Sequence, residues 1–197
     1  MPGIVVVGVD LAGVPHRPTG VCVLSNSDAV TMVAHTDDDV LCVIDREMPA
    51  LVTVDAPLSL PPGRKSIHER NGRHFRPCDL ELKRKRIPFF PITLGPMRGL
   101  TERGMALRDR MEKKGFRVIE AYPGGAQDVW GIPRVKHDVQ GLWKGLARLG
   151  IRGLREDCSG HELDAATAAL VGRLYLQGEA EIYGFFSSGA IIMPRKW

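Results

Sequence analysis

Four acidic residues occupy comparable places in this sequence. Asp10, Asp55 and Glu120 each close an apolar segment that predicts a β-strand, and Asp164 lies one turn inside a late predicted helix. Because the carboxyl ends of parallel strands meet at one edge of a sheet, we expect the three strand-end acids to converge there. Asp164 lies on a helix side otherwise made of small and apolar residues, an unfavourable place for an aspartate without a function.

Carboxylates gathered in this way repel one another unless a cation neutralises them. Oxygen-only ligand sets favour hard ions such as Mg²⁺ or Mn²⁺. Two such ions can hold the attacking water and the leaving oxygen of a phosphodiester. The four acids therefore suggest a two-metal phosphodiesterase site. The alternatives are a turn or capping role for Asp10 and, for Glu120, a hydrogen bond to Tyr122 or to a backbone amide.

The first half of the chain predicts a mixed sheet that places these acids. The opening apolar run is continuous, as in a strand buried on both faces. Two further strands, separated by a turn, form an antiparallel meander with it, and a helix then leads to a parallel strand beside the first. The predicted strands are 4–9, 19–24, 29–34 and 51–55, and the predicted helix is 37–48.

The second half predicts an α/β continuation. A helix precedes the strand that ends on Glu120, two helices follow it, and Ser159 and Glu162 form a capping box at the start of the helix that carries Asp164. A hairpin ends the pattern. The predicted ranges are helix 100–114, strand 116–120, helices 124–131 and 139–149, and hairpin strands 182–186 and 190–193.

Residues 56–97 form a proline-rich stretch without clean periodicity, which predicts an active-site insertion. Asp79 would cap a short basic helix within it. The part from 64 to 86 holds nine basic and three acidic residues, which suggests a phosphate-facing surface, although a solvated helix face is the ordinary alternative. Phe75, Phe89 and Phe90 could stack on bases or simply pack. The candidate nucleic-acid contacts are Arg64, Lys65, Arg73, Lys83, Arg84 and Arg98.

The length of 197 residues predicts a single domain over 1–197 that includes this insertion. The four cysteines show no close pair typical of a zinc site or redox motif. Neither a signal peptide nor a membrane span is indicated. We therefore expect a cytoplasmic protein without membrane contact.

The order of elements and acids resembles the ribonuclease H fold of ribonuclease H, Holliday junction resolvases and transposases. More closely, a series of motifs resembles the family of domain of unknown function 429, whose members are described as predicted nucleases. The motifs run in order over nearly the whole chain. They are Gly8-Val9-Asp10-Leu11-Ala12, Val54-Asp55-Ala56-Pro57, Arg76-Pro77-Cys78-Asp79, Leu100-Thr101-Glu102-Arg103-Gly104, Ile119-Glu120-Ala121-Tyr122-Pro123-Gly124 and His161-Glu162-Leu163-Asp164.

Carried over residue by residue, the resemblance implies metal ligation by Asp10, Asp55 and Asp164. Glu120 stands where resolvases place an additional acid. His161, three residues before Asp164 as in some resolvases, would position a water or transfer a proton, unless it is an exposed residue of the first helical turn. Since resolvases act as dimers, the resemblance also raises a homodimer, but no heptad repeat or long apolar stripe requires one.

Two other classes of function stay open at this point. Asp10-Leu11-Ala12-Gly13 with Thr19-Gly20 loosely resembles the phosphate-gripping hairpin of actin-like ATPases, whose halves have a related fold. Those enzymes close two such domains over the nucleotide, whereas this chain has residues for one. The third hypothesis is a non-catalytic module that binds nucleic acid or protein through the basic insertion.

Overall fold

The sheet at the centre of the molecule is mixed. The structure, a computed structural model, describes residues 3–14 and 16–196. The strand order is β3-β2-β1-β4-β5, in which β1 pairs antiparallel with β2 and parallel with β4. This α/β arrangement confirms the predicted meander and crossover. The strands are β1 (Val5–Asp10), β2 (Thr19–Ser25), β3 (Asp28–Ala34), β4 (Leu51–Asp55) and β5 (Val118–Glu120).

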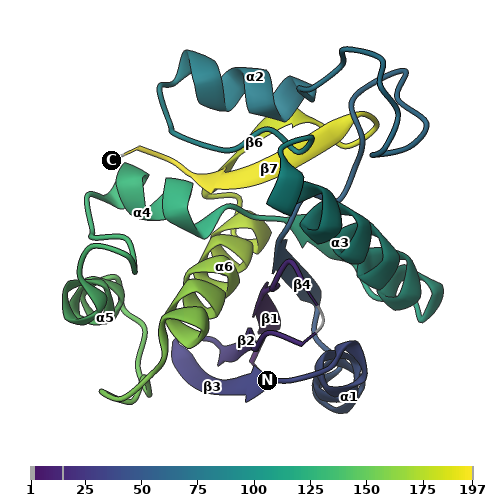
Figure 1. Cartoon of the computed structure of the whole chain (residues 1–197). Helices are drawn as coiled ribbons and strands as arrows, with labels where there is room; N and C mark the ends of the chain where they lie inside the picture. Colours follow the sequence, from purple (N-terminus) through teal and green to yellow (C-terminus); the bar gives the residue numbers. More distant parts are fainter. Residues whose placement is uncertain (1–2, 15, 197) are drawn as a thin grey trace.

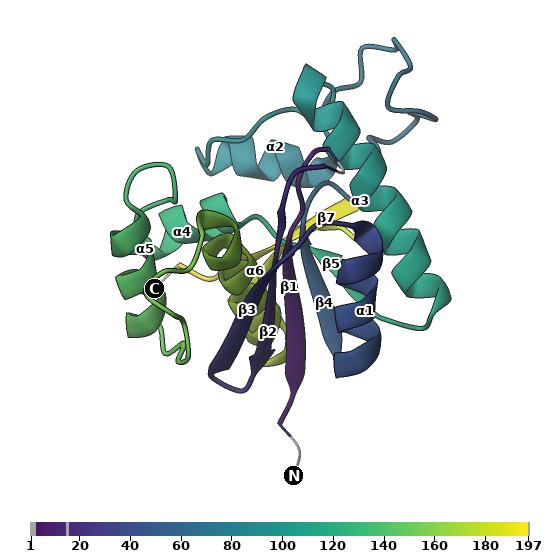
Figure 2. The same cartoon turned by 60° about the horizontal axis from the view of Figure 1, so that its bottom comes forward.

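Helices cover both faces of the sheet (Figures 1 and 2). One face is covered by α6, with α4 and α5 outside it, and the other by α1 and α3. Alternate β1 residues serve the two cores, since Val6 packs in the α6 core and Val7 and Val9 pack in the opposite one. These helices are α1 (Asp37–Glu47), α3 (Gly95–Lys113), α4 (Pro123–Trp130), α5 (Val139–Arg148) and α6 (Gly160–Leu176).

The predicted insertion and the final hairpin lie together beyond the carboxyl ends of β1 and β4 (Figure 2). Helix α2 (Pro77–Arg84) of the insertion packs on the two-stranded sheet of β6 (Ala180–Phe185) and β7 (Gly189–Pro194). An isolated bridge between Ala121 and Ile192 joins β7 to the segment after β5. A small third hydrophobic core, formed by α2, β6 and β7, therefore lies over the edge of the main sheet that carries the acids.

Two capping predictions are confirmed. The side chain of Ser159 accepts a hydrogen bond from the Glu162 backbone, and Glu162 accepts one from the Ser159 N–H, so the box fixes the first turn of α6. In α2, the Asp79 carboxylate accepts the Arg76 backbone N–H at 2.8 Å. Both caps lie next to residues of the candidate site.

Some element boundaries differ from the predictions. Helix α3 begins at Gly95 rather than at 100, because Pro96 occupies the first turn, where its missing N–H costs nothing. Strand β5 is limited to Val118–Glu120, and the hairpin strands are longer than predicted. In the described part of the chain, no helix has the length and apolar character needed to cross a membrane.

Candidate active site

Asp10 and Asp55 end two neighbouring parallel strands in the same register. The ladder between β1 and β4 pairs Val9 with Val54 and Asp10 with Asp55. Because the two strands are parallel, both carboxylates arise at the same edge of the sheet. The pairing is set by the apolar residues before each aspartate, which must alternate between the two cores.

Helix α6 brings two more predicted residues to this edge. The Nδ1 atom of His161 lies 2.6 Å from Oδ2 of Asp10, and since a carboxylate can only accept, Nδ1 carries the shared hydrogen. This contact raises the pKa of His161. Asp164 follows one helical turn later, on the same face.

Two glycines let α6 approach the sheet closely enough for these contacts. A Cβ on Gly20 of β2 would lie 2.0 Å from the His161 carbonyl oxygen, and one on Gly8 of β1 would lie 2.1 Å from the Ala165 carbonyl oxygen. No side chain fits at either position. The helix therefore rests on strand backbone, and its first turn reaches Asp10.

The charge of the cluster is left largely uncompensated around Asp55. Burial and the neighbouring acids Asp10, Asp164 and Glu120 raise the pKa of Asp55 well above its ordinary value, and none of the described residues donates a hydrogen bond to its side chain. Burial and Asp10 likewise raise the pKa of Asp164 to about 7, although Gln127 donates to its carboxylate at 2.6 Å. A bound cation would relieve this repulsion.

Glu120 forms hydrogen bonds within the protein, including one to a backbone amide, which is an alternative that the sequence left open. The Arg76 guanidinium donates to both of its carboxylate oxygens, at 2.6 and 2.8 Å, and the Leu58 N–H donates a third hydrogen bond. Arg76 also forms an ion pair with Asp79, and all three charged side chains are buried. Glu120 thus has an internal partner where the sequence predicted a metal ion.

The donor types fit a hard divalent cation, but the side chains are not arranged around one. Within residues 3–14 and 16–196, no three His, Cys, Asp or Glu side chains form a group that would hold a metal ion. Asp10 is directed to His161 and Asp164 to Gln127. Ligation by Asp10, Asp55 and Asp164 would therefore require these side chains to move closer together than they are here.

Arg134 is a charged neighbour of the cluster that the sequence did not indicate. It forms an ion pair with Asp128, and its Nη1 donates to the Tyr122 hydroxyl at 3.2 Å. Its positive charge opposes the rise in the pKa of Asp55 and Asp164. No motif marks this arginine, because only the turn after α4 carries it back toward the strand ends.

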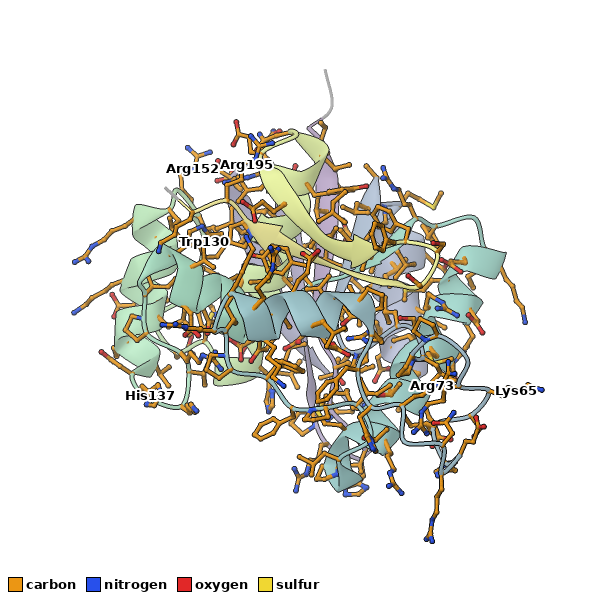
Figure 3. All side chains as sticks on the ribbon, turned by 90° about the horizontal axis from the view of Figure 1, so that it is seen from above. Lys65, Arg73, Trp130, His137, Arg152 and Arg195 are labelled. Atoms are coloured by element: carbon orange, nitrogen blue, oxygen red, sulfur yellow. The ribbon has the colours of Figure 1, made fainter. Side chains whose placement is uncertain are left out.

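The predicted nucleic-acid contacts divide into one buried residue and five exposed ones. Arg64 is buried and donates to four backbone carbonyls of its own loop, so it is a structural residue of the insertion rather than an available phosphate ligand. Figure 3 shows Lys65 and Arg73 at the outer edge of the insertion. The exposed residues are Lys65, Arg73, Lys83, Arg84 and Arg98.

Two solved structures are similar to this one. The Thermus thermophilus RuvC structure matches at a TM-score of 0.52 and 14% sequence identity, over 95% of this chain and 99% of that chain. The structure of T. thermophilus RuvC in complex with Holliday junction substrate matches at a TM-score of 0.49 and 17% identity, with the same coverage. At such identities the first match shows a shared ribonuclease H-like fold and nothing finer.

The sequence comparisons give the family. No curated protein sequence matches the chain significantly. The model of the family described as "Protein of unknown function (DUF429)" matches residues 8–185, which is most of the chain. The chain therefore belongs to the DUF429 family.

Proposed function

We propose that this protein is a metal-dependent nuclease that hydrolyses phosphodiester bonds of nucleic acid. The observation that carries the proposal is the environment of Asp55, a partly buried carboxylate in register with Asp10. It is surrounded by like charges, and no residue in the described part of the chain donates a hydrogen bond to it. Leaving such a group unpaired is costly unless a cation binds there. The RuvC-like fold is compatible with this chemistry.

Asp10, Asp55 and Asp164 would hold one or two Mg²⁺ or Mn²⁺ ions. When bound, such ions supply a nucleophilic water at neutral pH and stabilise the charge that develops on phosphate oxygens. Glu120 would have a positioning role. Its carboxylate accepts hydrogen bonds from the Leu58 N–H and from Arg76, and these bonds hold the segment after β4 in place.

His161 is placed to hold a proton beside the cluster. Its Nδ1–H is fixed by Asp10, so Nε2 is the atom that would accept or donate a proton. Arg134 would attract the phosphate, and the exposed cations of the insertion would position the neighbouring backbone. These side chains come from β1, β4, α6, the turn after α4 and the insertion, which explains why no single stretch of sequence contains the site.

The direct test is cleavage by the purified chain. We expect Mg²⁺ or Mn²⁺ to support cleavage of a set of labelled DNA and RNA substrates that covers single strands, duplexes, bulges and junctions. Asp55→Asn should lower the rate by about 100-fold or more, beyond the effect usual for partners of a ligand. Asp109→Asn, at an exposed site on α3, is the matched control and should retain the parent rate.

Two outcomes would refute the proposal. One is survival of every substrate with both metals, and the other is an Asp55→Asn variant that cleaves as fast as the parent. Salt-dependent binding without turnover, unchanged after neutralisation of the acids, would instead support a non-catalytic binding module.

A further inference from the structure

A cavity of about 200 Å³ opens beside Asp55. It lies between the carboxyl ends of β4 and β5, the insertion and the first turns of α3, and Asp55 itself forms part of the wall. It therefore shares Asp55 with the candidate active site. The apolar part of its lining includes Phe89, Phe90, Ile92, Met97, Leu100 and Tyr122.

Apart from Asp55, the polar side chains of the wall already have internal partners. Arg76 donates to Asp79 and Glu120, and the Tyr122 hydroxyl donates to the Pro88 carbonyl oxygen at 2.5 Å. The lining thus holds one cationic side chain, Arg76, and three acidic ones, Asp55, Asp79 and Glu120. A phosphate would be repelled from this interior, whereas a neutral and largely apolar group would be accepted.

Aromatic side chains shape the opening. Phe89 is held edge-on against Phe75, with ring centroids 6.1 Å apart and an interplanar angle of 76°. Phe90 also lines the cavity, and 68% of its surface is exposed, so its ring is accessible to a bound group. The volume is below the roughly 300–1,000 Å³ of drug-sized sites, so it suits one flat ring system.

Two exposed cationic residues directly follow lining residues in the sequence. Leu82 and Met97 line the cavity, and Lys83 and Arg98, the next residues in sequence, are exposed. The Lys83 Nζ lies over the Phe75 ring, 5.6 Å from its centroid. An apolar interior, with exposed cations on the same two helices, suits a nucleotide whose base enters and whose phosphates stay outside.

We propose that this cavity receives one unpaired nucleobase of the substrate, next to the phosphodiester bond at Asp10 and Asp55. The inference rests on the proposed nuclease function and deepens it, because it names the substrate class as nucleic acid with an unpaired or extruded nucleotide. Apart from the Asp55 carboxylate, the wall offers stacking rather than free hydrogen-bonding groups. Binding should therefore depend on the presence of a base more than on which base it is.

The test is a binding measurement on the wild-type chain in chelator, which does not depend on catalysis. Fluorescence anisotropy would compare a labelled duplex, the same duplex with one bulged adenine, and the bulged duplex with an abasic site in place of that adenine. We expect the bulged duplex to bind about tenfold more tightly than the plain duplex, as for one base–aromatic stack, and the abasic probe to lose this preference. Equal binding of the three probes would overturn the inference.

Variants of the exposed rim extend the test. Phe90→Ala should abolish the preference for the bulged adenine and Phe90→Trp should retain it, since a larger ring can stack in the same place. Phe185→Ala is the matched control, because Phe185 is 66% exposed and does not line the cavity. If Phe90→Ala retains the preference, or Phe185→Ala loses it equally, a cavity that binds a base is refuted.

The two proposals can fail separately. A base-dependent preference in chelator with no cleavage in Mg²⁺ or Mn²⁺ would refute the nuclease and leave a site for unpaired bases. Metal-dependent cleavage at Asp55, with the three probes bound equally, would keep the nuclease and refute the base site.

Discussion

Asp10 and Asp55 are register partners at the ends of adjacent parallel strands. Among residues 3–14 and 16–196, Asp10 has a side-chain hydrogen-bonding neighbour, His161 at 2.6 Å, and Asp55 has none. The two carboxylates therefore differ in their hydrogen bonding although they lie at the same edge of the sheet. Asp10 is oriented by α6, while Asp55 faces the cavity and the other acids. This asymmetry is the basis of the predictions below.

Neutralising Asp55 should stabilise the metal-free protein. Because burial and like charges raise the pKa of this carboxyl, Asp55→Asn should increase the free energy of unfolding in chelator. Mg²⁺ or Mn²⁺ should raise the melting temperature of the parent and of Asp109→Asn, but not that of Asp55→Asn. A loss of stability in Asp55→Asn, with an undiminished metal response, would contradict this expectation.

The stability of the metal-free protein should fall as the pH rises toward neutrality. The pKa of Asp164 is raised from 3.8 to about 7, so the folded state binds more protons than the unfolded state between these values. Its stabilising contribution is complete below about pH 4 and is lost as the pH rises through 7. Thermal unfolding in chelator from pH 5 to 8 should show this decline, and Asp164→Asn should reduce it. An identical profile in the variant would argue against the raised pKa.

The Arg76 ion-pair cluster should support the fold rather than bind metal. Arg76→Met leaves Glu120 and Asp79 buried without their partner, and we expect it to cost about 3–5 kcal/mol in chemical denaturation. Glu120→Gln should also destabilise the protein, yet leave the metal-induced rise in melting temperature intact. If Glu120→Gln abolished that rise, Glu120 would be a ligand, as the sequence predicted.

Gly20 should be required for the close approach of α6. Gly20→Ala places a methyl group against the His161 carbonyl, so the helix must shift, at a cost of about 1–3 kcal/mol or more. The shift would also weaken the contact between His161 and Asp10. Gly95→Ala is the matched control, because a Cβ there meets no atom within 4 Å. Equal stability of the two variants, measured by urea unfolding, would show that the packing is less tight than described.

Much of the fold could be predicted because its signals are local. The continuous apolar run before Asp10 specifies a strand buried on both faces, and the capping box of Ser159 and Glu162 specifies where α6 begins. The placement of Asp10 and Asp55 at one edge follows from strand direction alone. Boundaries such as the start of α3 were less accurate, since Pro96 can either end a loop or open a helix.

The sequence by itself thus determined the order of elements, the edge at which the acids gather and the family. Tertiary structure decided the partner of each side chain, because partners come from segments far apart in the chain. Arg76 of the insertion forms an ion pair with Glu120 of β5, and Arg64 donates hydrogen bonds to carbonyls of its own loop. Arg134, which follows α4 in the chain, lies near Asp55. The sequence alone does not show whether a charged side chain will be buried against an opposite charge, exposed to solvent or placed near like charges. That choice depends on distance and burial, which only the packed chain defines.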